Sequence, residues 1–167
     1  MAHNEIEKKY LIAMPDEGML AAMEGCEVWQ IEQIYLTAEP GTTRRVRRVE
    51  ENGEVRYYKT FKRAVSAMTA QEDEGLISCE AYEALCAERN PALNVIVKTR
   101  CRVPYAGQVL EFDLYPFWTD RAVMEIELES ESQQPVIPEW VSVIKDVTTD
   151  FRYKNAALAR EIPMDSI

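Results

Sequence analysis

Short segments in which apolar and polar residues alternate strictly dominate this 167-residue sequence. Strict alternation is typical of a β-strand whose two faces meet different environments. The pattern recurs about eight times, at residues 5–11, 31–36, 43–49, 55–62, 68–77, 95–103, 109–115 and 123–129. We therefore expect a sheet of about eight strands to be the main structure of the chain.

The connections between these segments predict tight turns and short helices. Asn52-Gly53 separates two alternating segments and favours a two-residue hairpin. Helix signals lie at residues 15–23, at 79–86 after a candidate N-cap at Ser78, at 137–140 and at 155–160. No linker or repeat divides the chain. The prediction is one α+β domain over residues 1–167, in which an eight-stranded antiparallel β-barrel carries a few flanking helices.

Composition and charge argue against several kinds of partner and chemistry. The 29 acidic residues outnumber the 19 basic ones, and the formal net charge of −10 argues against binding nucleic acid by neutralising its phosphates. No segment approaches the roughly 18 consecutive apolar residues of a membrane span. The single histidine, His3, argues against histidine-based catalysis and His-rich zinc sites. Four cysteines without a CxxC pair, and no signal-like N-terminus, lead us to expect a cytoplasmic protein with reduced thiols.

Charged residues of one sign gather on single faces of the expected strands, because side chains at i and i+2 share a face. The acidic rows are Glu5/Glu7 with Lys9 beside them, Glu72/Glu74, Glu111/Asp113 and Glu125/Glu127/Glu129, and the basic rows are Arg45/Arg47 and Lys98/Arg100/Arg102. A single charged row is usually the solvated face of a sheet. Like charges side by side repel without a counter-charge, however, so rows of both signs favour faces turned into a closed barrel.

Such a barrel would suit a metal ion together with a polyphosphate. Mg²⁺ and Mn²⁺ prefer carboxylate oxygens and are often shared with substrate phosphates. Arginine binds phosphate oxygens in a bidentate manner, and lysine supplies a point charge. The basic cluster that would match the several charges of a triphosphate consists of Arg45, Arg47, Lys62, Lys98 and Arg100.

The same residues carry a resemblance to a known family. Glu5-x-Glu7-x-Lys9 is similar to the ExExK signature of the CYTH superfamily, the triphosphate tunnel metalloenzymes. Further motifs follow in the family's order at residues 45–47, 58–62, 98–100, 111–113, 124–128 and 146–155, so the likeness spans nearly the whole chain. The resemblance implies an eight-stranded antiparallel tunnel in which acidic residues bind Mg²⁺ or Mn²⁺ and basic residues hold a triphosphate.

The resemblance also implies roles for individual residues. The implied metal-binding carboxylates are Glu5, Glu7, Glu74, Asp113, Glu125 and Glu127. The implied triphosphate ligands are Lys9, Arg45, Arg47, Lys62, Lys98 and Arg100, and the implied catalytic residues are Glu7, Lys9 and Glu127. Lys9 is a candidate to activate water if neighbouring cations lower its pKa, although the nearby carboxylates oppose this effect.

One departure from the family pattern concerns the fifth strand, where members often read R-x-E-x-E. Here Ala70 takes the place of the arginine, while Glu72 and Glu74 are kept. The candidates to replace the missing charge are Arg63, Arg102 and Lys154, and the sequence does not choose among them.

The expected function is the metal-dependent hydrolysis of a linear triphosphate, with inorganic tripolyphosphate as the favoured small polyanionic substrate. Two alternatives keep the fold: an adenylate cyclase that converts ATP to cyclic AMP and pyrophosphate, and a thiamine triphosphatase. A third is a non-catalytic sensor of polyphosphate or nucleotide, for which Ala70 is the one supporting feature. The choice between a monomer and a homodimer stays open.

Overall fold

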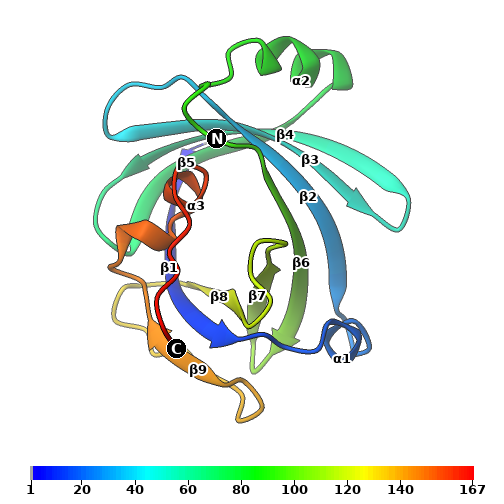
Figure 1. Ribbon diagram of the computed structural model, residues 1–167, viewed down its shortest axis with the longest axis vertical. Coiled ribbons are helices and arrows are strands. Elements are labelled where there is room, and N and C mark those ends of the chain that lie inside the picture. The colour runs from blue at the N-terminus through cyan, green and yellow to red at the C-terminus, as the bar shows by residue number, and fades with distance from the viewer. Residues whose placement is uncertain (1) are drawn as a thin grey trace.

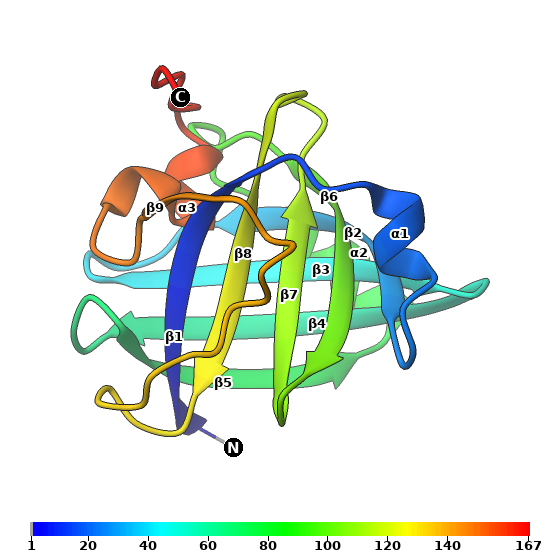
Figure 2. The ribbon, with the colours of Figure 1, turned by 90° about the horizontal axis from the view of Figure 1, so that it is seen from below.

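The computed structural model describes residues 2–167 and contains an antiparallel sheet that closes on itself (Figures 1 and 2). Its strands are β1 (Ala2–Ala13), β2 (Glu27–Leu36), β3 (Thr42–Glu51), β4 (Glu54–Ala64), β5 (Thr69–Ile77), β6 (Ile96–Tyr105), β7 (Gln108–Leu114), β8 (Arg121–Leu128) and β9 (Val143–Asp146). Their order is β5-β4-β3-β2-β6-β7-β8-β1-β9, and a further pairing of β1 with β5 closes the first eight into a barrel. The predicted eight-stranded antiparallel barrel is therefore confirmed.

Strand β1 changes its neighbour on one side along its length. Its first residues, from Ala2 to Ile6, pair with β5, whereas residues 10–12 pair with β9. On its other side β1 pairs with β8 from Ile6 to Ala13. The barrel is thus closed at one end of β1 and parts from β5 at the other, and this parting places a cavity in the wall of the tunnel.

The largest apolar core lies on the outer side of β1, β6, β7 and β8 and not in the barrel interior. It contains Tyr10, Phe112, Met124 and Ile126. Helix α1 (Glu17–Ala21) contributes Leu20 to it, and the segment between β8 and β9 crosses the outside of β7 and β8 (Figure 2). Because this face is covered by protein, the charged residues that alternate with it along the strands face inward.

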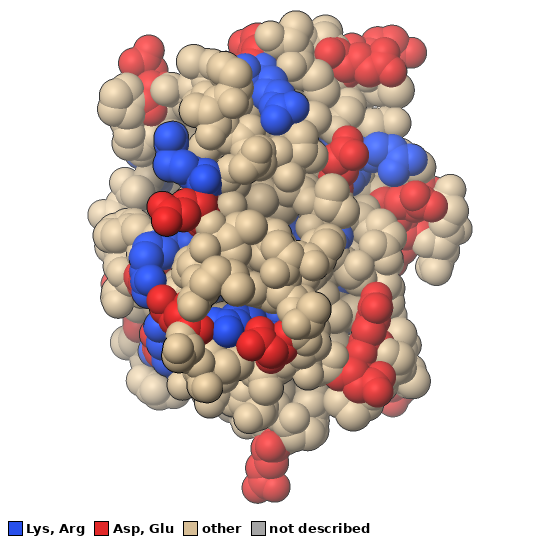
Figure 3. Space-filling model, viewed as in Figure 1, with Lys and Arg blue, Asp and Glu red and all other residues tan. Residues whose placement is uncertain are grey.

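The barrel interior has a charged middle and one apolar end. Lys9, Arg47, Arg100 and Glu125 are buried there. The apolar end is built from inward residues of the strands and from the C-terminal elements η1 (Phe151–Tyr153) and α3 (Asn155–Leu158), with Tyr153 completely buried. Side chains therefore occupy the space that the ribbon leaves open at the centre of the barrel (Figure 3).

The structure confirms most of the predicted connections and contradicts one. Asn52 and Gly53 adopt positive φ values of 51° and 82°, as a two-residue hairpin turn requires. Helix α2 (Cys79–Cys86) begins after Ser78, whose side chain accepts a hydrogen bond from the Ala81 amide. The predicted helix at 137–140 was wrong, because these residues form only a turn closed by a 3.1 Å bond from the Val141 amide to the Pro138 carbonyl.

Within residues 2–167, no helix combines the length and the apolar character needed to cross a bilayer.

Candidate active site

The ExExK residues of β1 are placed by its pairing with two neighbouring strands. Glu5 lies opposite Ala70 of β5. Glu7 lies opposite Glu127 of β8, and Lys9 lies opposite Glu125. Since strand side chains alternate, all three point into the tunnel, while Tyr10 packs in the outer core.

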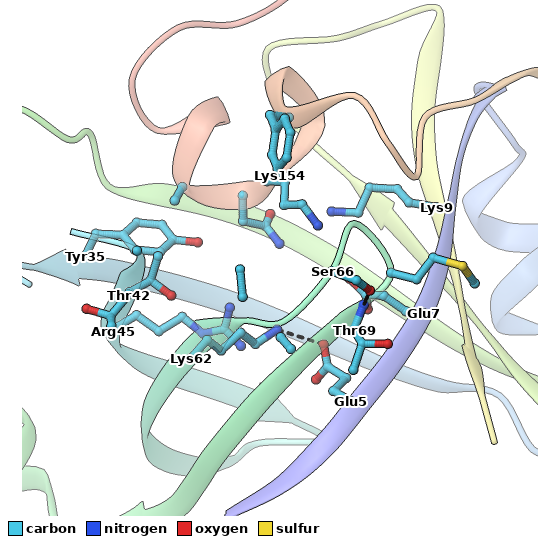
Figure 4. A pocket seen from close by; sticks show the side chains of 18 residues that line it. Glu5, Glu7, Lys9, Tyr35, Thr42, Arg45, Lys62, Ser66, Thr69 and Lys154 are labelled. Carbon is cyan, nitrogen blue, oxygen red and sulfur yellow. Dashed lines mark hydrogen bonds and ion pairs between the residues drawn. The ribbon is translucent and has the colours of Figure 1, made fainter. Parts of the chain in front are cut away.

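A cavity of about 300 Å³ opens where β1 parts from β5 (Figure 4). Its charged lining residues are the carboxylates of Glu5 and Glu7 and the cations of Lys9, Arg45, Lys62 and Lys154. The predicted inward placement of Glu5 and Arg45 is confirmed, because both line this cavity. The charged lining thus consists of four cations and two carboxylates, in contrast to the net charge of −10 of the whole chain.

Lys62 holds the carboxylates at the entrance of this cavity. Its Nζ lies 2.8 Å from Glu5 Oε1 and 3.3 Å from Glu72 Oε2. Burial raises the pKa of the Glu5 carboxyl, but Lys62 and a hydrogen bond with Glu72 outweigh this effect and lower the pKa to about 2. Burial and Glu5 in turn raise the pKa of Glu72 to about 7. The Glu5 and Glu72 carboxyls are therefore joined by a hydrogen bond, and both lie beside the Lys62 ammonium group.

Glu7 lies in a different electrostatic environment from Glu5. Burial and the neighbouring Glu125 raise the pKa of the Glu7 carboxyl to about 8. Its cross-strand neighbour Glu127 is an exposed residue, and partial desolvation of its carboxyl together with Glu5 raises its pKa as well. Burial and neighbouring carboxylates thus both favour the protonated form of these two carboxyls.

Lys9 is held in its protonated form. Its Nζ lies 3.2 Å from Glu125 Oε1 and donates a hydrogen bond of 3.2 Å to the Tyr153 carbonyl. Burial lowers the pKa of Lys9, but Glu125 and Glu7 outweigh this effect and keep the pKa above its usual value. A lowered pKa, the condition for Lys9 to activate water, is therefore not found.

Arg45 lines the cavity and carries a donor that has no partner in the described part of the chain. Its Nε atom is buried and has no hydrogen-bond partner among residues 2–167. Its Nη2 lies 3.9 Å from Glu74 Oε2, and Glu74 itself accepts a 2.6 Å hydrogen bond from Thr60. Arg45 is therefore held by one distant carboxylate and by no hydrogen bond of its Nε among residues 2–167.

The remaining predicted ligands form a buried network behind the cavity. Arg100 donates to both oxygens of Asp113, at 2.7 and 2.9 Å, and Lys98 Nζ lies 2.9 Å from Asp113 Oδ2. Arg47 Nε donates a 2.8 Å hydrogen bond to Gln33 Oε1. None of these five residues lines the described cavity. The network therefore supports the floor of the site, and both Asp113 oxygens are already bound by cations.

The oxygen donors of a metal site are present, and several of them are paired with lysines in the structure. Among residues 2–167, no three Asp, Glu, His or Cys side chains converge closely enough to hold an ion. Lys62 pairs with Glu5 and Glu72, and Lys9 pairs with Glu125. The carboxylates nearest to the cavity are those of Glu5 and Glu7.

The three candidates for the charge missing at Ala70 lie in different places. Arg63 is exposed and alternates with the inward Lys62 on β4, so it faces away from the tunnel. Arg102 pairs with Glu27 and Glu111, and its guanidinium lies 4.8 Å from the centre of the Trp29 ring. Lys154 lines the cavity itself, as does Ala70.

Sequence reasoning assigned no site role to Tyr35, Glu72 or the hydroxyl residues of the cavity wall. Tyr35, Thr43, Ser66 and Thr69 line the cavity, and Glu72 is buried beside Lys62. The alternation of β2 and β5 places Tyr35 and Glu72 on inward faces, which is the signal that could have found them. Ser66 lies in a loop, where no such periodicity applies.

Comparison with known proteins places the chain in a family. No family model matches the sequence. An inorganic triphosphatase from Nitrosomonas europaea is 32% identical over 164 residues, which are 95% of this chain and 99% of that enzyme. The chain belongs to the CYTH superfamily. The resemblance carried by the ExExK motif is therefore confirmed.

Solved structures agree with this membership of the CYTH superfamily. The crystal structure of an inorganic triphosphatase aligns with a TM-score of 0.57 and 29% identity, over 95% of this chain and 96% of that one. A protein from Pyrococcus furiosus aligns with a TM-score of 0.59 over 77% of this chain and 80% of that one. Its identity of 23% shows a shared CYTH fold alone.

Proposed function

We propose that this chain is an inorganic triphosphatase that hydrolyses tripolyphosphate in the cavity between β1 and β5. The observation that carries the proposal is the set of four cations around Glu5 and Glu7 in one small cavity. The 32% identical relative from Nitrosomonas europaea, named as an inorganic triphosphatase, supports the same reaction. A volume of about 300 Å³ lies at the small end of ligand pockets and suits a compact polyanion.

The cations of the cavity bind and orient the substrate. Arg45 offers its unpaired Nε, and Lys9 and Lys62 bring ammonium groups that are held in place by Glu125 and Glu5. Charge-assisted hydrogen bonds from such groups to phosphate oxygens are stronger than neutral ones. Because Lys9 keeps its proton, its role is to stabilise negative charge on the reacting phosphate, and it does not act as a base.

Mg²⁺ or Mn²⁺ is the proposed cofactor, held by Glu5 and Glu7 with Glu127 as their neighbour on β8. The donor set fits such an ion in its chemistry, because it consists of carboxylate oxygens that line one cavity. When bound, the ion polarises phosphate oxygens and makes water more acidic. In the overall reaction, water adds to the terminal phosphorus, the bond to the bridging oxygen breaks, and orthophosphate and pyrophosphate are released.

One assay panel tests the proposal. Purified protein is incubated with Mg²⁺ or Mn²⁺ and tripolyphosphate, ATP or thiamine triphosphate, and orthophosphate, pyrophosphate and cyclic AMP are measured. We expect equal amounts of orthophosphate and pyrophosphate from tripolyphosphate. Cyclic AMP as the main product would identify a cyclase, and tight binding without turnover under either metal would identify a sensor.

The matched variants are Glu7→Gln, in the cavity, and Arg63→Gln, on the outer face of β4. Glu7→Gln should reduce turnover by about a hundredfold or more, since it removes a charged ligand of the metal–substrate complex. Arg63→Gln should leave turnover unchanged. Equal rates for Glu7→Gln and the wild type would contradict the assignment of the site.

A further inference from the structure

Two hydrogen bonds in series join a buried arginine to the wall of the cavity. Arg47 Nε donates a 2.8 Å hydrogen bond to Gln33 Oε1, and Gln33 Nε2 donates a 3.0 Å hydrogen bond to the Tyr35 hydroxyl oxygen. Gln33 and Tyr35 lie two residues apart on β2, so their side chains share its inward face. Gln33 is completely buried, whereas Tyr35 lines the cavity. Gln33 therefore connects the interior of the barrel to the candidate site.

Arg47 sets the direction of both hydrogen bonds. A guanidinium carries donors and no acceptor, so the atom of Gln33 that faces Arg47 must be the amide oxygen. The amide nitrogen of Gln33 then faces Tyr35, and this nitrogen can only donate. Because the Tyr35 hydroxyl oxygen accepts that bond, its own proton is directed away from Gln33. In Figure 4 the Tyr35 hydroxyl points into the cavity.

Gln33 also binds Arg47 without neutralising its charge. Within residues 2–167 no carboxylate forms an ion pair with Arg47, whereas the neighbouring Arg100 is paired with Asp113. Burial together with Arg45 and Arg100 lowers the pKa of Arg47 to about 10, so the guanidinium stays protonated at neutral pH. A neutral amide at this position therefore satisfies one donor of Arg47 and leaves its positive charge to attract an anion.

We propose that Gln33 is a positioning residue, which orients the Tyr35 hydroxyl so that its proton is offered to an oxygen of the anion in the cavity. The inference rests on the proposed function for the identity of this anion, a triphosphate. Ionised phosphate oxygens accept hydrogen bonds, so they require a hydroxyl that presents its proton and not its lone pairs. A hydroxyl that is oriented before the anion arrives does not have to be ordered during binding.

The main variant reverses the direction of the hydrogen bond to Tyr35. Gln33→Glu places a carboxylate, which only accepts, between Arg47 and Tyr35, so the hydroxyl proton should turn away from the cavity. Gln33→Met removes the amide without adding a charge, and Tyr35→Phe removes the hydroxyl alone. Gln30→Glu is the matched control, because it makes the same substitution at an exposed position of β2.

Two readouts are measured for each protein: KM and kcat for tripolyphosphate, and the affinity of the metal-free protein for tripolyphosphate by calorimetry. Loss of one hydrogen bond to a charged oxygen should weaken binding by about tenfold in Tyr35→Phe. Gln33→Glu should weaken binding at least as much, and Gln30→Glu should match the wild type. Gln33→Met should lie between Gln33→Glu and the wild type, because a hydroxyl that is free to rotate can still turn to the anion.

Combined substitutions separate positioning from a purely structural effect. If Gln33→Glu has already turned the hydroxyl away, Tyr35→Phe should cost much less in that background than in the wild type, so the two losses should not add. In the Gln33→Met background, Tyr35→Phe should keep most of its cost. Melting temperatures of all variants show which of them are folded under the assay conditions.

Additive losses for Gln33→Glu and Tyr35→Phe would overturn the inference. Wild-type affinity and KM in Gln33→Met would also overturn it, and this arm remains informative if the buried carboxylate prevents folding. If the variants show the expected coupling in binding but the wild type does not hydrolyse tripolyphosphate, the proposed hydrolase activity fails and the role of Gln33 stands. A wild type that does not bind tripolyphosphate would overturn both proposals.

Discussion

At the scale of single residues, Glu7 couples the chemistry of the cavity to the stability of the fold. Burial and Glu125 raise its pKa from 4.5 to about 8, so the folded, metal-free protein binds a proton there that the unfolded chain has already lost at neutral pH. Extra protons bound by the folded state stabilise it at low pH, and this contribution is lost as the pH rises. The affected window runs from about 4.5 to about 8.

The first prediction follows from this window. With metal ions removed by a chelator, the melting temperature of the wild type should fall as the pH rises from 5 to 8. The fall should be smaller in Glu7→Gln, because its amide does not titrate. Thermal unfolding at several pH values measures both slopes. Parallel slopes would show that Glu7 does not keep a raised pKa in the folded protein.

A second measurement tests whether Glu7 also contributes to metal binding. At pH 8, Mg²⁺ or Mn²⁺ should raise the melting temperature of the wild type, because binding to the folded state alone stabilises it, and should do so much less in Glu7→Gln. An equal shift in both proteins would place the ion elsewhere.

At the scale of elements, a glycine in the turn between β3 and β4 can be compared with a glycine inside strand β5. Gly53 has a φ of 82°, where a Cβ is strained, and Gly75 in β5 does not lie in that region. A Cβ at either position meets no atom within 4 Å, so steric contact does not distinguish them. Only the backbone conformation does.

We therefore expect Gly53→Ala to lower the free energy of unfolding by about 1 kcal/mol, the usual cost of the left-handed region for an alanine. Gly75→Ala should leave it unchanged or raise it slightly, because alanine limits the unfolded chain more than glycine does. Urea titration of both variants measures the difference. Equal effects would mean that the turn relaxes to another conformation.

The elements that the sequence predicts well are those with long alternation. All eight expected strands are present, and the same-face rows of β1, β3, β6 and β8 point inward as the period of two requires. Strand β9 spans only Val143–Asp146, which is too short for a periodic signal. Residues 137–140 form a turn in which the Trp140 ring stacks on Phe112, with centroids 5.8 Å apart, and no local pattern indicates this tertiary contact.

The sequence predicts which residue types face into the barrel, but it does not predict which of them line the cavity and which are buried away from it. Alternation places Lys9 and Lys98 on inward faces alike, yet Lys9 lines the cavity and Lys98 is completely buried against Asp113. That difference depends on where β1 leaves β5 and on where residues 153–155 dock. Both are contacts between distant segments, and no local pattern encodes them.

At the scale of the whole molecule, the distribution of charge decides which anions can bind. The face seen in Figure 3 carries acidic side chains around its periphery, and the chain as a whole is acidic, with a net charge of −10. The cations of the site are gathered inside a cavity of about 300 Å³. A small polyanion can enter such a cavity, whereas a nucleic-acid duplex meets the acidic exterior first.

This contrast predicts the outcome of a competition experiment. Pyrophosphate should inhibit tripolyphosphate binding, because it fits the same cations. Double-stranded DNA at an equal concentration of phosphate groups should not, even at low salt, where such binding is strongest. Calorimetry with each competitor measures the effect, and inhibition by DNA would reveal a basic surface that the cavity does not account for.

The pairing of β1 also sets the order in which the protein can be assembled during synthesis. Strand β1 carries Glu5, Glu7 and Lys9, but its partners begin much later in the chain, at Thr69 in β5 and at Arg121 in β8. Contacts so distant in sequence form late and slow the folding of a chain. Strand β1 therefore stays unpaired until β5 and β8 have been synthesised, and the cavity is completed only when Lys154 follows them.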